Sequence, residues 1–334
     1  MPLNLCNADV LITGGTGTFG QAMVRRLLRL DRETPRRIIV FSRDELKQHE
    51  MAVRLGHHPH ASRLRYFLGD VRDLARLKTA LRGVDIVIHA AALKQVPSCE
   101  YNPIEAVKTN VGGAQNLIEA AIEMGVSRVI ALSTDKACEP INLYGATKLV
   151  AEKLFVNAAT LAGNLPTRFA VVRYGNVIGS RGSVVELFRT IIAAGGSELP
   201  ITDASMTRFL ITKREAVNWV LDNIRMMDGG EIFVPELPSA GLLDIAVAVG
   251  GKDVRIVGAR PGEKVHETLI TKHEAPRALA IVGGYEILNH TCAGGLISET
   301  EGYHSGQHAG RLTAQEVAGL LDRESLESQE DGAL

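Results

Sequence analysis

The sequence of 334 residues predicts an α/β fold with a doubly wound parallel sheet, and three observations lead to that prediction. Short runs rich in β-branched residues alternate with helical segments, as in successive βαβ units. Most of these runs are apolar at nearly every position, which is typical of strands covered on both faces of a parallel sheet. A glycine-rich turn joins the first run to the first helix, which favours a Rossmann-type sheet.

The elements follow in order along the first half of the chain. The expected strands are residues 10–13, 38–41, 65–68, 85–90, 129–133 and 169–173. Apolar side chains recur at helical spacing over residues 20–30, 103–125 and 144–162. After about residue 180, Pro and Gly interrupt this pattern, so we expect a small mixed C-terminal substrate-binding lobe.

We therefore divide the chain into three parts. Residues 1–180 should form a cofactor-binding Rossmann domain, and residues 181–320 a substrate-binding lobe interleaved with it. The acidic segment 321–334 has no aromatic residue and should be disordered.

Composition excludes several classes of protein. The 37 Lys and Arg residues nearly balance the 38 Asp and Glu residues, which argues against a nucleic-acid partner. No run approaches the ~18 apolar residues that a membrane helix needs, so no membrane partner is expected. The N-terminus lacks a basic segment followed by a long apolar one, and the cysteines are dispersed without zinc-ligand spacing. We expect a cytoplasmic protein without a metal site.

The first turn predicts a dinucleotide site. Glycines recur as G-x-x-G-x-x-G directly after the first strand and before a helix. The free N–H groups and the dipole of a helix N-terminus favour a pyrophosphate, and glycine lets the backbone approach it closely. The expected contacts in this turn are Gly14, Thr16, Gly17, Thr18, Phe19 and Gly20.

The end of the second strand bears on the choice of cofactor, because an acidic residue there favours NAD and a basic one favours NADP. Ser42, Arg43 and Lys47 are suited to the extra phosphate of NADP. Asp44 and Glu45 weigh toward NAD, although a Ser-x-x-Glu capping box starting at Ser42 would occupy Glu45. We expect NADP and leave NAD open. Further expected contacts are Leu46 in the same segment, and Asp70 and Val71, which are either adenine contacts or a plain helix cap.

A reactive set of side chains follows the fifth strand. Tyr144 and Lys148 are spaced to share one helix face, where an ammonium lowers the pKa of a phenol toward neutrality. With Thr134 at the strand end and the glycine turn, these residues resemble the extended short-chain dehydrogenase/reductase family over roughly residues 8–270. The resemblance implies a tightly held nicotinamide cofactor, a nucleotide-sugar substrate and catalytic roles for Thr134, Tyr144 and Lys148.

Five segments narrow the resemblance to the inverting UDP-N-acetylglucosamine 4,6-dehydratases, of which the best-known members open the pseudaminic acid pathway. The segments are residues 42–48, 90–97, 133–136, 173–177 and 260–264. The resemblance implies a hydro-lyase that moves hydride from C4 to C6 through NADP, loses water and inverts C5, for surface glycan or flagellin modification. It also implies a dimer-based homo-oligomer, such as a hexamer. It places Ala90, Lys94 and Val177 at the cofactor and Lys94, Asn176, Arg181, Arg208, Arg260 and Glu263 at the substrate.

Asp135 and Lys136 occupy the position at which dehydratases that retain the C5 configuration share an Asp-Glu pair. We assign Lys136 as the C5 base and Asp135 as the C6 acid, with the division of roles left open. A basic Lys136 requires a depressed pKa, from burial or nearby cations. A surface ion pair is the structural alternative. The functional alternatives are a dehydratase with 5-epimerase activity, a UDP-sugar 4-epimerase and a dinucleotide-sensing scaffold.

Overall fold

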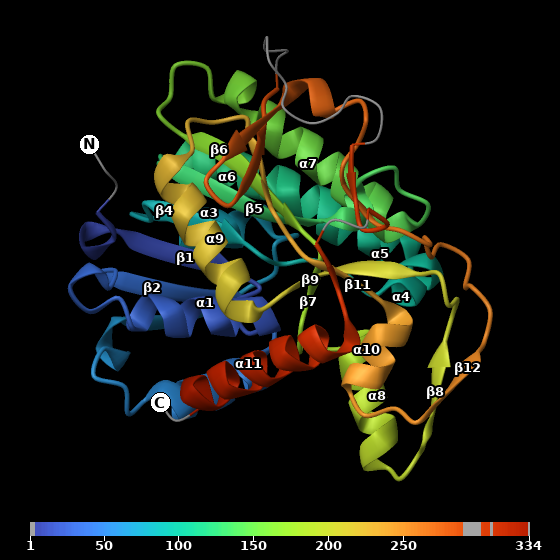
Figure 1. Ribbon diagram of the computed structural model, residues 1–334. Helices are drawn as coiled ribbons and strands as arrows, with labels where there is room; N and C mark the ends of the chain where they lie inside the picture. The colour runs from blue at the N-terminus through green and yellow to red at the C-terminus, as the bar shows by residue number, and fades with distance from the viewer. Residues whose placement is uncertain (1–3, 290–301, 308–309, 333–334) are drawn as a thin grey trace.

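The computed structural model describes residues 4–289, 302–307 and 310–332. A nine-stranded sheet in the order β14-β15-β10-β6-β5-β4-β1-β2-β3 forms its centre (Figure 1). The parallel strands are β1 (Asp9–Thr13), β2 (Arg37–Ser42), β3 (Leu64–Leu68), β4 (Ile86–His89), β5 (Arg128–Thr134), β6 (Arg168–Tyr174) and β10 (Ile232–Pro235). The antiparallel edge consists of β14 (Ala278–Ile281) and β15 (Gly284–Ile287). The expected strands and the doubly wound order are confirmed.

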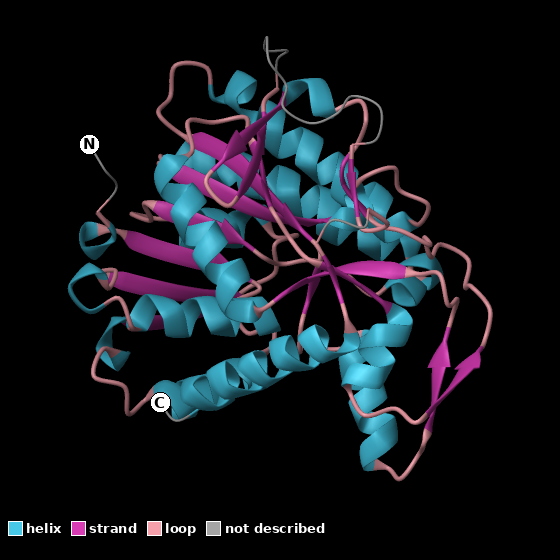
Figure 2. Cartoon of the chain, in the orientation of Figure 1, coloured by secondary structure: helices cyan, strands magenta, loops and turns pink. Residues whose placement is uncertain are grey.

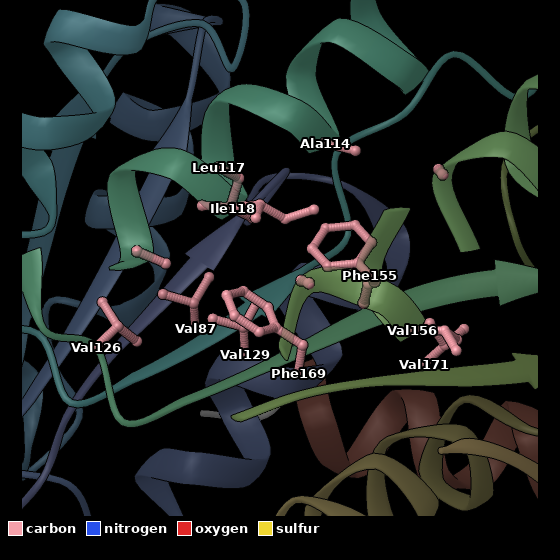
Figure 3. Close-up of a cluster of buried hydrophobic side chains, with 14 of the residues drawn as sticks. Val87, Ala114, Leu117, Ile118, Val126, Val129, Phe155, Val156, Phe169 and Val171 are labelled. Carbon is pink, nitrogen blue, oxygen red and sulfur yellow. The ribbon is translucent and has the colours of Figure 1, made fainter. Parts of the chain in front are cut away.

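Helices cover both faces of this sheet (Figure 2). Alternate residues of each parallel strand pack into the cores on opposite faces. Leu11 and Val87 pack with α3 (Leu74–Ala80), α6 (Gly113–Met124) and α7 (Leu143–Ala162). Figure 3 shows part of this cluster, in which Phe155 of α7 lies over Val87, Val129 and Phe169. Ile12 and Ile38 face the opposite layer of α1 (Thr18–Leu28), α2 (Glu45–Leu55) and α9 (Lys213–Met226).

The helical expectations hold with one refinement. Residues 103–125 form α5 (Pro103–Val107), a π-helical turn (Lys108–Gly112) and α6, preceded by α4 (Val96–Tyr101). Short 3-10 helices lie at Leu5–Asn7, Asp31–Glu33, Ala61–Arg63, Asp135–Ala137 and Ala275–Arg277.

The second half of the chain builds a mixed lobe and also completes the main sheet. Its four-stranded sheet joins β7 (Asn176–Val177), β9 (Thr207–Ile211), β11 (Ser239–Gly241) and β17 (Arg311–Leu312). Two-stranded pairs are β8 (Glu198–Ile201) with β12 (Asp253–Ile256), and β13 (Thr268–Ile270) with β16 (Tyr303–His304). The lobe's helices are α8 (Val184–Ala193), α10 (Leu242–Ala248) and α11 (Ala314–Gly332).

The expectation of a disordered tail at residues 321–334 is wrong, because α11 runs to Gly332. Leu320 and Leu321 are buried with Val317 in the core of the lobe. The buried Glu324 carboxylate accepts a hydrogen bond from the Lys213 backbone amide at 2.8 Å. The acidic composition of this segment gave no sign that α11 packs against the lobe in this way. Residues 333–334 lie outside the described residues.

Within the described ranges, no helix combines the length and the apolar character needed to cross a membrane.

Candidate functional site

A cavity of about 710 Å³ opens at the carboxyl ends of the central parallel strands. This is the edge at which sheets of this type bind ligands. Most of the residues expected at the site line the cavity: Gly14, Thr16, Gly17, Thr18, Phe19, Gly20, Ser42, Arg43, Asp44, Lys47, Asp70, Val71, Ala90, Lys94, Thr134, Lys136, Tyr144, Lys148, Asn176, Val177, Arg260 and Glu263. Five expected residues do not line it: Glu45, Leu46, Asp135, Arg181 and Arg208.

The glycine turn has the shape that a dinucleotide requires. A Cβ atom at Gly14, where φ is +64°, would lie 2.9 Å from the Ala91 Cα atom. A Cβ atom at Gly20 would lie 2.5 Å from the Gly15 Cα atom. Gly17 precedes α1 and offers no side chain to cap its N–H groups. The helix terminus therefore remains available to an anion.

Two buried hydroxyl groups in the cavity also fit a polar ligand. Thr109 Oγ1 and Ser133 Oγ have no hydrogen-bond partner among the residues that the structure describes. Buried hydroxyls rarely remain unpaired, so these two are available to a polar ligand that fills the cavity. Neither was among the residues expected at the site. Ser133 precedes Thr134 at a strand end, which could have indicated it, whereas Thr109 lies in the unexpected π-helical turn.

The expected capping box at Ser42 is wrong. Strand β2 extends through Ser42, so the helix begins later and Asp44 becomes its N-cap. The Asp44 carboxylate accepts a hydrogen bond from the Lys47 backbone amide at 3.0 Å and pairs with the Lys47 ammonium. Ser42 Oγ accepts from Gln48 Nε2 at 3.0 Å. Arg43 stays largely exposed at the rim, 3.6 Å from the Asp70 carboxylate.

Tyr144 and Lys148 lie on α7 and line the cavity. The Lys148 ammonium does not lower the pKa of Tyr144 as expected. Lys148 Nζ donates to the Leu132 carbonyl oxygen at 2.6 Å, and burial lowers the pKa of Lys148 to about 8. Burial raises the pKa of Tyr144 to about 12, against the opposing effects of the Lys136 ammonium and a hydrogen bond with Thr134. The expected shift of this pKa toward neutrality is therefore wrong for this structure.

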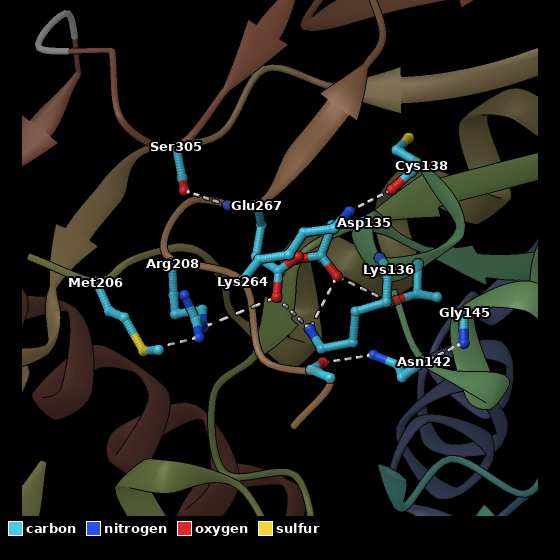
Figure 4. Close-up of polar contacts among 12 residues, drawn as sticks. Asp135, Lys136, Cys138, Asn142, Gly145, Met206, Arg208, Lys264, Glu267 and Ser305 are labelled. Carbon is cyan, nitrogen blue, oxygen red and sulfur yellow. Dashed lines mark hydrogen bonds and ion pairs between the residues drawn. The ribbon is translucent and has the colours of Figure 1, made fainter. Parts of the chain in front are cut away.

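Asp135 and Lys136 belong to a buried group of charges rather than to a surface ion pair (Figure 4). The Asp135 side chain is 0% exposed, and Thr134 Oγ1 donates to its Oδ1 at 2.9 Å. Lys136 Nζ lies 3.0 Å from Asp135 Oδ1 and 3.2 Å from Glu267 Oε1. Arg208 Nε is 3.9 Å from the same Glu267 oxygen. We call Asp135, Lys136, Glu267 and Arg208 the charge cluster.

Sequence reasoning missed Glu267. It follows the 260–264 segment but has no motif of its own, and it reaches Lys136 only because the chain returns to β13 beside the end of β5. Its carboxylate also changes the expected state of Lys136. Burial lowers the pKa of Lys136, but the opposing effect of Asp135 and Glu267 is larger, so the net pKa lies well above its ordinary value. The expected depressed pKa is wrong here, because carboxylates rather than cations dominate the surroundings.

The fold separates the remaining residues that were expected at the substrate. Asn176, Arg260 and Glu263 lie along the cavity with Lys94. Arg208 is buried behind them and donates to the carbonyl oxygens of Thr207 and Val265. Arg181 is exposed in the segment before α8, outside the cavity lining.

Comparison with known proteins agrees with this geometry. A family model described as "Polysaccharide biosynthesis protein" matches residues 10–285. The chain belongs to this family.

Two curated relatives of this chain have different named activities. The chain is 54% identical to the "UDP-N-acetylglucosamine 4,6-dehydratase (inverting)" of Campylobacter jejuni over 80% of its own length and 78% of that protein. It is 44% identical to a "UDP-glucose 4-epimerase" of Rickettsia akari over 83% of its length and 82% of that protein.

Among solved structures, Pen from Bacillus thuringiensis superimposes with a TM-score of 0.86 at 34% identity, covering 96% of this chain and all of Pen (100%). The dTDP-glucose 4,6-dehydratase DesIV from Streptomyces venezuelae, solved with NAD, gives a TM-score of 0.68 at 25% identity and covers 77% of this chain and 86% of DesIV. These structures share the Rossmann-type fold.

Proposed function

We propose that this polysaccharide biosynthesis family member is an inverting UDP-N-acetylglucosamine 4,6-dehydratase. The observation that carries the proposal is the Asp135–Lys136 pair, in which Lys136 lines the cavity with Tyr144 and Asp135 is buried behind it. Elimination across C5 and C6 needs a base and an acid, which this pair supplies. A simple 4-epimerase needs no such pair, and the epimerase relative is the more distant of the two, at 44% against 54% identity.

The cofactor we propose is NADP, held by the glycine turn. A nicotinamide dinucleotide supplies reversible acceptance of hydride when bound. Thr109 and Ser133 would satisfy their free hydroxyl groups on it, and the N-terminus of α1 would receive its pyrophosphate. NADP rather than NAD is supported by Arg43, which lies exposed at the cavity rim beside Ser42 and Lys47. The Asp44 carboxylate already pairs with the backbone amide and the ammonium of Lys47. It is therefore less available to bind the ribose hydroxyl groups of NAD.

Tyr144 is the group suited to take the proton of the C4 hydroxyl. Its pKa of about 12 keeps the phenol protonated in the free site. The Lys136 ammonium and the Thr134 hydroxyl both favour the phenolate, so they are the groups that would bring Tyr144 into its proton-accepting form. Lys148 is held by the Leu132 carbonyl and would hold the ribose of the cofactor.

Asp135 and Lys136 would act on C5 and C6. Oxidation at C4 acidifies the C5 proton. Lys136 can accept that proton once its ammonium has passed a proton to the Asp135 carboxylate, 3.0 Å away. Asp135, protonated, donates to the departing C6 hydroxyl oxygen, and water leaves. Burial raises the pKa of Asp135, which favours the protonated acid needed for this step. Return of hydride to C6 from the bound cofactor would be accompanied by delivery of a proton to the opposite face of C5, which would invert that centre.

We further propose a cytoplasmic, dimer-based homo-oligomer that supplies a nucleotide-sugar pathway for surface glycan or flagellin modification. The exposed apolar residues Tyr101 and Ile104 at α4 and α5 suit contact with a second copy of the chain. Size-exclusion chromatography with light scattering would measure the assembly, and a strictly monomeric protein would contradict this part.

The decisive experiment is proton NMR of UDP-N-acetylglucosamine incubated with the purified protein in D2O. We expect a new C6 methyl signal and ring couplings of the L-arabino sugar. D-xylo couplings would remove the inversion. Formation of UDP-N-acetylgalactosamine would indicate an epimerase, and an unchanged spectrum with bound cofactor would favour another sugar nucleotide or a dinucleotide sensor.

Lys136→Ala provides the matched test of chemistry. We expect cofactor absorbance to be retained and dehydration to be abolished. Full activity in this variant would reject Lys136 as the C5 base.

A further inference from the structure

Glu267 is a buried carboxylate without an assigned role. Its side chain is 3% exposed and its Oε1 contacts Lys136 Nζ at 3.2 Å. Its other oxygen, Oε2, is buried and has no hydrogen-bond partner within the described part of the chain. Leaving a charged oxygen unpaired in the interior is costly, so this arrangement calls for a reason beyond stability.

The position of Glu267 is fixed from both sides. Its backbone amide donates to Ser305 Oγ at 2.9 Å, and Ser305 also pairs with Thr207 at 2.7 Å. Two residues farther on, the Leu269 carbonyl oxygen accepts from Arg173 Nη1 at 2.8 Å. Arg173 is itself buried in β6, so the segment that carries Glu267 is tied to the main sheet.

Glu267 and Asp135 hold Lys136 between them. Figure 4 shows Lys136 between the two carboxylates, and its side chain, which is 25% exposed, also lines the cavity. Asp135 alone would leave a flexible four-carbon side chain several rotamers to choose from. The second carboxylate restricts the ammonium to one place beside Asp135.

We propose that Glu267 is a positioning residue, which holds Lys136 Nζ against Asp135 so that a proton can pass between the two before they act on C5 and C6. This inference rests on the proposed function. It adds a second carboxylate beside Lys136 without placing Glu267 against the substrate.

One proton passes between Lys136 and Asp135 before elimination. An Nζ proton moves across the 3.0 Å contact to Asp135 Oδ1, which leaves a neutral amine and a neutral carboxylic acid. The amine takes the C5 proton as the C5–C6 double bond forms. The acid gives its proton to the C6 oxygen as the C6–O bond breaks. At the end of elimination, the ammonium and the carboxylate are restored, so the pair needs no proton from solvent.

The charge of Glu267 affects both members of the pair in the same direction. It raises the pKa of Asp135 and the pKa of Lys136, and its removal therefore lowers both. Because these groups titrate together, the prediction concerns the pH profile of the cluster as a whole. The charged and titratable groups that face Lys136 or Glu267 are Asp135, Arg208, Lys94, Tyr144 and Lys264.

The test compares Glu267→Gln with Glu267→Asp in the full-length protein loaded with its cofactor. For Glu267→Gln we expect kcat to fall about 10²-fold with little change in KM. We also expect the profile of kcat against pH to move by about 1–3 pH units toward lower pH. Glu267→Asp keeps the charge but shortens the side chain, so kcat should fall while the profile stays in place. Glu50→Gln, an exposed position on α2, is the control.

A second readout separates positioning from folding. Exchange of the C5 proton with D2O, followed by NMR, should slow in both Glu267 variants while cofactor absorbance is retained. If Glu267→Gln does not fold, Ser305→Ala releases the backbone of Glu267 without changing any charge, and it should lower kcat without moving the profile.

An unshifted Glu267→Gln profile, or full kcat in Glu267→Asp and Ser305→Ala, would overturn the inference. If the native protein yields no dehydrated product, the proposed function fails instead.

Discussion

Replacing Arg173 by methionine should destabilise the protein strongly. Arg173 is 1% exposed and lies between two carboxylates, with Nη2 at 2.7 Å from Glu152 and 2.9 Å from Glu274. Methionine fills a similar volume but leaves both carboxylates in the interior without a counter-charge. Removing one partner of a buried ionic group costs more than the group contributes when intact, because the remaining charges stay desolvated.

The magnitude follows from Glu274. Burial alone would raise the pKa of Glu274, but Arg173 and Thr271 lower it from 4.5 to about 2. That difference corresponds to about 3 kcal/mol of stability at neutral pH. With Glu152 also left unpaired, we expect Arg173→Met to lower the free energy of unfolding by about 3–5 kcal/mol.

The assay is urea unfolding followed by far-UV circular dichroism and by the fluorescence of the single tryptophan, Trp219. The matched control is Arg168→Met on the same strand, where the arginine is 46% exposed and pairs with Asp228. An exposed pair contributes about 0–1 kcal/mol. Equal, small effects in the two variants would refute the reasoning.

The pH dependence provides a second check. A carboxylate whose folded pKa is depressed stabilises the protein above its unfolded pKa and loses that effect as pH falls. The contribution of Glu274 should therefore be complete above about pH 4.5 and decline toward pH 2. In Arg173→Met the desolvated carboxylate favours protonation instead. The difference between native protein and variant should shrink as pH falls from 7 to 3; a constant difference would contradict this account.

The remaining predictions concern the site. Gly20→Ala should abolish cofactor retention, measured by absorbance of the purified protein, because its Cβ would lie 2.5 Å from backbone atoms; Gly112→Ala, with nothing within 4 Å, should retain it. Retention in both would show that the turn does not hold the cofactor. Tyr144→Phe should lower kcat about 10²–10⁴-fold while UDP binding by calorimetry is unchanged; near-native turnover would exclude the phenol as a proton acceptor. Arg43→Ala should weaken NADP more than NAD in fluorescence titration, and equal weakening would reject it as the phosphate contact.

Local chemistry made much of the fold predictable. Continuous apolar runs such as residues 38–41 are strands because both faces of the sheet are covered, and this pattern is visible in one sequence. The glycine turn was predictable for a similar reason, since Gly14 has a positive φ and Gly20 packs against backbone atoms where a Cβ atom would not fit. The helical structure of residues 321–332 was not predictable, because it depends on the tertiary contacts of α11.

The site divides in the same way. Thr134, Tyr144 and Lys148 could be placed at the cavity from spacing along one strand and one helix. Their protonation states could not be predicted, because burial and neighbouring charges set each pKa, and both depend on the whole structure.

Glu267 marks the boundary most clearly. Six strands of the sheet and the glycine turn could be predicted from the chain, because each depends on residues close together in it. That Lys136 lies between two carboxylates depends on the folded chain, since Asp135 is its neighbour in sequence whereas Glu267 precedes the distant strand β13. Electrostatic interactions act through space, so their partners cannot be found by spacing along the chain.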